Sequence, residues 1–62
     1  MESKLKERRK ASGMSQKALA EASGLSFRTI QDWERWGTDR ARVGQLRKAA
    51  AALRCDMADL IG

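Results

Sequence analysis

The polar side chains between positions 28 and 35 stand at helical spacing, and their types limit the chemistry that the chain could perform. Arg28, Gln31 and Asp32 lie within five residues of one another, and Arg35 follows three residues later. At 100° per residue in a helix, these four side chains share one face. A guanidinium, an amide and a carboxylate together donate and accept hydrogen bonds, so this face suits the recognition of a polar partner.

The chain offers little that could support catalysis. It has no histidine and one cysteine, Cys55, and no carboxylates cluster near a nucleophile. We therefore expect no enzyme activity, no metal site, no cofactor and no small-molecule substrate. The lone cysteine cannot form an internal disulfide, and we expect it to be a reduced, buried, small apolar residue.

Length and charge set further bounds. With 62 residues, the chain is expected to form one domain spanning 1–62, near the lower size limit for folding alone. Lys and Arg number 13 against 8 acidic residues, and the net charge of +5 favours a polyanionic partner. A solvated cationic surface without any partner would show the same charge. The charged N-terminus leads into no long apolar run, so we expect a cytoplasmic protein that does not bind membranes.

The polar face must be held by elements around it, and the segment from Gln16 to Trp33 indicates which ones. Ala20 is small enough for two helices to cross closely, and Gly24 can adopt the positive φ of a tight turn. Ile30 and Trp33 are apolar anchors one helical turn apart, opposite the polar face. The spacing predicts a helix-turn-helix whose second helix carries the arginine-bearing face.

The whole chain reads as all-α, because helix signals recur and nothing alternates with period two. We predict a compact domain of five helices. They are expected at about residues 3–12, 15–24, 26–36 and 43–53, with a short last helix after 56.

Individual residues support these boundaries. Ser15 and Ser26 are good N-caps, and Asp56 with Asp59 would cap the last helix. The polar loop at 37–42 is expected to be ordered but mobile. The fourth helix would turn one apolar stripe toward the core: Val43, Leu46, Ala49, Ala50 and Leu53.

The chain resembles the Cro and phage-repressor (Xre-type) family of helix-turn-helix DNA-binding domains, which have the lambda-repressor-like fold. Two segments carry the resemblance: G-M-S-Q-K-A-L-A-E-A-S-G-L-S-F-R-T-I-Q-D-W-E at 13–34 and V-G-Q-L-R-K-A-A-A-A-L-R-C-D-M-A-D-L-I at 43–61. It covers nearly all of the chain. The second segment independently matches the helices that complete the core of this family.

The resemblance implies sequence-specific binding of double-stranded DNA by a small transcriptional regulator, with the helix at about 26–36 in the major groove. One domain of this size offers about 600 to 1,000 Å² to DNA, so we expect a homodimer on a palindromic site. The alternative is a protein-interaction module with the same fold, such as an antitoxin or adaptor. Steep salt dependence would distinguish DNA binding from that alternative.

The resemblance also implies roles for particular residues. The side chains expected to contact base edges are Phe27, Arg28, Gln31 and Asp32. Those expected at phosphates, together with the helix N-terminus at Val43, are Ser15, Gln16, Ser26, Thr29, Arg35, Thr38, Arg40 and Arg42.

Three of the base-edge positions have alternative interpretations. Arg28 suits a bidentate contact to guanine, yet it could simply pair with Asp32 at i,i+4. Phe27 could contact a thymine methyl or pack partly into the core. Asp32 could accept from cytosine N4 or orient an arginine.

Two further expectations concern the scaffold. The resemblance implies a buried ion pair between Arg9 and Glu34 that ties the recognition helix to the first helix. Trp36 stands near where many relatives have a glycine. Its indole is expected to be half-buried against the last two helices, the alternative being exposure for a partner subunit.

Overall fold

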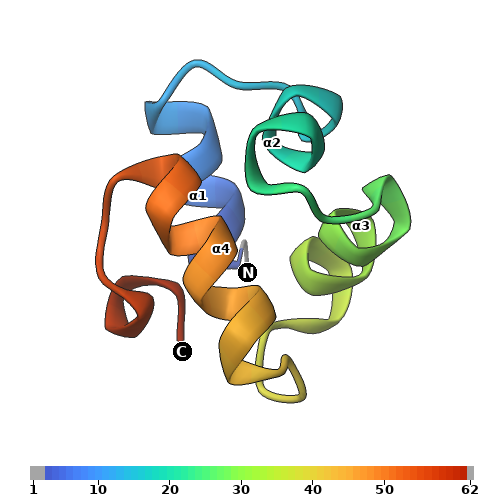
Figure 1. The fold of residues 1–62 in the computed structure, drawn as a ribbon, viewed down its shortest axis with the longest axis vertical. Coiled ribbons are helices and arrows are strands. Elements are labelled where there is room, and N and C mark those ends of the chain that lie inside the picture. The colour runs from blue at the N-terminus through green and yellow to red at the C-terminus, as the bar shows by residue number, and fades with distance from the viewer. Residues whose placement is uncertain (1–2, 62) are drawn as a thin grey trace.

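The computed structural model describes residues 3–61 and places four α-helices and one 3-10 turn in them (Figure 1). The elements are α1 (Lys4–Ala11), α2 (Gln16–Ser23), α3 (Phe27–Trp36), α4 (Val43–Leu53) and η1 (Met57–Leu60). No strand occurs in this part of the chain, which confirms the all-α prediction. The expected fifth helix is instead a four-residue 3-10 turn.

The hydrogen bonds around η1 explain this difference. Asp59 N donates to the carbonyl oxygen of Asp56, an i to i+3 bond, and the Asp59 carboxylate accepts from Asp56 N at 3.1 Å. This capping box was expected, but it closes a single tight turn. Ile61 then returns to extended backbone.

Serine side chains begin the first three helices. The hydroxyls of Ser3, Ser15 and Ser26 each accept from a backbone N–H three residues later, at 3.0 to 3.1 Å. Gly24 ends α2 with φ 75°, the left-handed conformation that the turn requires. The predicted starts and the turn of the helix-turn-helix are therefore confirmed.

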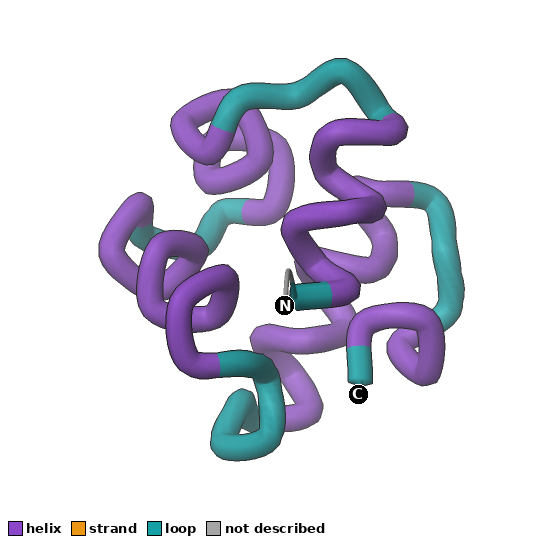
Figure 2. The backbone as a smooth tube through the Cα atoms, turned by 180° about the vertical axis from the view of Figure 1, so that it is seen from behind, coloured by secondary structure: helices purple, strands orange, loops and turns teal. Residues whose placement is uncertain are grey.

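The helices enclose one core. α2 packs against both α3 and α4, while η1 packs against α4 and α1 (Figures 1 and 2). Leu5, Leu19, Ile30 and Leu60, one each from α1, α2, α3 and η1, are at most 2% exposed. The α4 stripe buries its last four predicted members, but Val43 is 61% exposed because it opens the first turn of α4 beside the loop.

The loop between α3 and α4 is tied to the interior by one side chain. Thr38 is only 6% exposed, and its hydroxyl donates to the carbonyl oxygen of Leu60 at 2.7 Å. Ala41 N donates to the Thr38 carbonyl at 2.9 Å and closes a turn. The loop that the sequence predicts to be ordered but mobile is thus anchored near its start.

Two predicted burials are corrected by the structure. Trp36 is 74% exposed, because it lies about 120° around the helix axis from the buried Ile30. Cys55 is half-buried rather than buried, since it follows the left-handed residue Arg54 at the end of α4. Partial burial raises the pKa of the Cys55 thiol, an effect that Arg8 opposes. Among residues 3–61, no helix has the length and apolar composition needed to cross a membrane.

Candidate nucleic-acid interface

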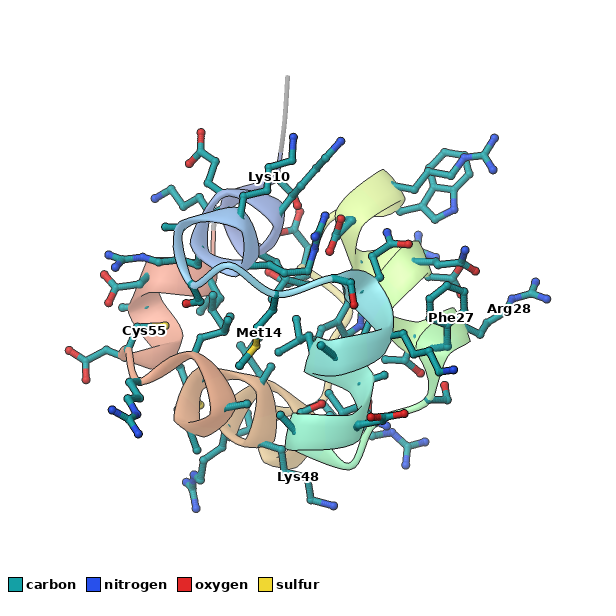
Figure 3. All side chains as sticks on the ribbon, turned by 90° about the horizontal axis from the view of Figure 1, so that it is seen from above. Lys10, Met14, Phe27, Arg28, Lys48 and Cys55 are labelled. Atoms are coloured by element: carbon teal, nitrogen blue, oxygen red, sulfur yellow. The ribbon has the colours of Figure 1, made fainter. Side chains whose placement is uncertain are left out.

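The outer face of α3 is a continuous polar surface. Ile30 and Trp33 are buried on the inner side, and Figure 3 shows Phe27 and Arg28 projecting away from the core. Phe27 is 46% exposed, so part of its side chain is covered by the protein and the rest faces solvent. The exposed polar side chains of this face are Arg28, Gln31, Asp32 and Arg35. The structure brings the predicted base-contacting residues together on one helix.

Arg28 is held only loosely. Its Nε lies 3.8 Å from a carboxylate oxygen of Asp32, and the Arg28 side chain is 85% exposed. An exposed i,i+4 pair of this kind contributes only a few tenths of a kcal/mol. The guanidinium can therefore leave Asp32 for a ligand at little cost.

A buried ion pair fixes α3 to α1. Arg9 Nε and Nη2 donate to the two carboxylate oxygens of Glu34 at 2.6 and 3.0 Å. Nη1 of the same guanidinium donates to the Met14 carbonyl at 2.8 Å. The side chains are 11% and 5% exposed, which confirms the expected ion pair. This bidentate geometry fixes how closely α3 approaches α1 and how α3 is rotated about its own axis.

Gln16 joins the same network from the start of α2. Its Nε2 donates to Glu34 Oε1 at 3.2 Å, so α1, α2 and α3 meet at one carboxylate. The resemblance implies a phosphate contact for Gln16, and in the structure its amide is bonded to Glu34. The amide keeps its carbonyl oxygen and its second N–H for another partner.

Two hollows lie on either side of the α3 face. The smaller one, of about 410 Å³, is lined by Gln16, Arg28, Gln31, Asp32, Glu34 and Arg35. The larger one, of about 640 Å³, lies between α3 and the following loop. It is lined by Arg28, Asp32, Trp33, Trp36, Gly37, Asp39, Arg40 and Ala41. Both are open, and guanidinium groups contribute to both.

The hydroxyls expected at phosphates already have partners within the chain. Ser15 and Ser26 cap α2 and α3, and Thr29 lies 2.8 Å from the Ser26 hydroxyl. Ser15 and Ser26 remain exposed, and a hydroxyl can take part in more than one hydrogen bond. Thr38 differs, because its buried hydroxyl is committed to Leu60. The Thr38 side chain is therefore not available to contact a phosphate, contrary to the prediction.

The arginine side chains of the loop before α4 remain accessible. Arg40 and Arg42 are exposed. Arg42 is the N-cap of α4, and its side chain makes no capping bond. The first N–H groups of α4, beginning at Val43, thus have no side-chain cap, unlike those of the three helices that begin after serine.

Sequence reasoning missed one feature of this face. The Arg35 guanidinium stacks on the Trp36 ring, with its carbon 5.0 Å from the ring centroid. An arginine followed by a tryptophan in the last turn of the predicted helix was the available signal. Within residues 3–61, no group of three His, Cys, Asp or Glu side chains is arranged to hold a metal ion.

Comparison with known proteins places this geometry in a family. A family model described as helix-turn-helix, of the Cro and phage-repressor type, matches residues 5–60. That family consists of DNA-binding domains. Neither the curated proteins nor the solved structures gave a significant match. Since the matched segment spans nearly all of the 62 residues, the chain belongs to the Cro and phage-repressor family of helix-turn-helix domains.

Proposed function

We propose that residues 1–62 form a single domain that binds double-stranded DNA at specific sequences as part of a small transcriptional regulator. The observation that supports this most directly is the outer face of α3. Its arginine, glutamine and aspartate side chains are all exposed, on a helix whose position is fixed by the pair between Arg9 and Glu34. A rigid helix with a polar outer face suits insertion into the major groove.

In this proposal, the first two turns of α3 read base edges. Arg28 donates two hydrogen bonds to guanine O6 and N7, and Asp32 either accepts from cytosine N4 or stays beside the guanidinium as a weak partner. Gln31 suits the N6 and N7 edge of adenine. Phe27, half exposed at the start of the helix, contacts a thymine methyl.

Phosphate contacts surround these base contacts. Gln16 at the start of α2 and Val43 N–H at the start of α4 each present a helix N-terminus to the backbone. The net charge of +5 adds long-range attraction. The remaining phosphate contacts in the proposal come from Ser15, Ser26, Thr29, Arg35, Arg40 and Arg42.

A single domain of this size covers little DNA. We therefore propose a homodimer that binds a palindromic site, with its two α3 helices in successive major grooves. The half-sites would then lie about one helical turn apart, 10 to 10.5 base pairs between centres.

Selection of bound sequences from a random duplex pool tests the proposal. We expect enrichment of a palindromic motif, followed by measured affinities that fall steeply as salt rises. A matched pool of single-stranded oligonucleotides serves as the control. If no duplex is enriched, or if the affinity for duplex DNA does not change with salt, the result would favour the protein-interaction alternative.

A further inference from the structure

Trp36 lies uncovered at the C-terminal end of α3. At 74%, it is the most exposed of the large apolar side chains in residues 3–61. An indole left in water is unfavourable, because its apolar surface gains from being covered. Within residues 3–61 the core does not cover the indole, and the guanidinium of Arg35 stacks on only part of it, so a partner is the remaining source of that gain.

The indole is nevertheless held in place. The Arg35 guanidinium stacks on it at 5.0 Å. Arg35 lines the smaller hollow but not the larger one, and Trp36 lines the larger but not the smaller. The indole therefore contacts the guanidinium and also lines the larger hollow. One part of its surface is covered by a cation, and another part faces open space.

The larger hollow has defined walls and a mixed charge. One wall is α3 and the other is the loop that Thr38 anchors to Leu60. Arg40 supplies a cation from the loop, and Asp39 lies beside it. Together with Arg35 behind the ring, these groups give the surface around Trp36 an apolar centre with guanidinium groups at its edges, and the carboxylates of Asp32 and Asp39 line the same hollow.

The position of Trp36 along α3 identifies what would meet it. Trp36 lies nine helical steps after Phe27, which at 1.5 Å per step is about 13.5 Å along the axis. The major groove is about 12 Å wide. If the first turns of α3 contact bases, the last residue lies at the edge of the groove. The sugar-phosphate backbone of one strand runs along that edge.

We propose that Trp36 packs its indole against a deoxyribose at this edge, while Arg35 and Arg40 contact the flanking phosphates. The inference rests on the proposed function and adds to it a neutral, apolar backbone contact. A deoxyribose presents C–H groups between two phosphates, and this alternation matches the indole between its guanidinium groups. Such a contact carries no sequence information, so it strengthens binding to every duplex equally.

Equilibrium binding to two duplexes of about 20 base pairs tests this contact, one enriched by selection and one of random sequence. Trp36→Ala should weaken binding to both by about fivefold to tenfold and leave the salt slope unchanged. Trp36→Phe is the matched control and should retain most of the affinity. Arg40→Ala should also weaken both, but with a salt slope lower by about one.

Fluorescence gives a second reading on the unaltered protein. Trp33 is buried, so acrylamide quenching reports mainly on Trp36. We expect either duplex to protect the indole from quenching. Unchanged thermal unfolding of Trp36→Ala would show that the exposed side chain does not support the fold.

Three outcomes would overturn the inference. The affinity of Trp36→Ala for both duplexes could lie within twofold of that of the unaltered chain, and DNA could leave the acrylamide quenching of the unaltered chain unchanged. Quenching could instead fall as protein concentration rises without DNA, which would assign the indole to a second copy of the chain. If the unaltered chain binds neither duplex, the proposed function fails first and the inference fails with it.

Discussion

Arg28 separates base reading from backbone binding at the scale of a single residue. If its guanidinium contacts guanine, Arg28→Ala should cost about 1 to 3 kcal/mol on the preferred site and remove the preference at one base pair per half-site. Arg40→Ala and Arg42→Ala are matched controls that also remove one cation each. They should weaken all duplexes alike and lower the salt slope by about one. An equal loss for Arg28→Ala on preferred and random DNA would make it a phosphate contact.

The ion pair of Arg9 and Glu34 gives a stability prediction at the same scale. Glu34→Ala leaves a guanidinium buried with only the Met14 carbonyl as partner, so unfolding free energy should fall by about 3 to 5 kcal/mol. Chemical denaturation followed by circular dichroism measures this. Gln16→Ala is the control, because it removes one bond to Glu34 without stranding a charge. A midpoint for Glu34→Ala close to that of the unaltered chain would contradict the prediction.

At the scale of elements, Arg54 carries a local strain. It caps α4 with φ 54° and ψ 44°, the left-handed conformation that glycine adopts most easily. Arg54→Gly should therefore raise the unfolding free energy by about 0.5 to 1 kcal/mol and increase Tm by a few degrees. Arg54→Ala removes the charge but keeps the Cβ atom, so it should give no such gain. Equal stabilisation by both changes would point to charge as the cause.

Local signals explain which elements could be predicted from the sequence. Ser15, Ser26 and Gly24 act through bonds to neighbouring residues, so the starts of α2 and α3 and the turn between them followed directly. The exposed polar face of α3 followed from helical spacing. The 3-10 form of η1 could not be predicted, because Asp56 and Asp59 are equally suited to cap a longer helix.

The features that the sequence did not predict depend on contacts between distant segments. The resemblance places Thr38 among the phosphate contacts. Its bond to Leu60 could not be predicted, because it joins positions 22 residues apart. The half-exposure of Cys55 and the exposure of Trp36 depend on how helix ends sit against the core. The pair of Arg9 and Glu34 was expected only through resemblance to a family.

At the scale of the whole molecule, the bond from Thr38 to Leu60 links the loop before α4 to the C-terminal turn. Thr38→Val keeps the shape and removes the donor, leaving a buried carbonyl oxygen without its partner. We expect a loss of about 1 to 3 kcal/mol in unfolding free energy and weaker binding to all duplexes. Thr38→Ser is the control that restores the hydroxyl. Unchanged stability of Thr38→Val would show that water replaces the bond.

This bond thermodynamically couples the loop between α3 and α4 to the C-terminal turn η1. η1 packs against α1 and α4, and its Leu60 carbonyl holds the loop that carries Arg40 and Arg42. A ligand or a second subunit that moves Leu60 would change the free energy of the loop and, in the proposed function, its affinity for phosphate. By reciprocity, DNA held by the loop would favour the docked state of the C-terminal turn. If the proposed phosphate contacts of the loop hold, η1 is therefore a place from which DNA affinity would be regulated without contact with DNA.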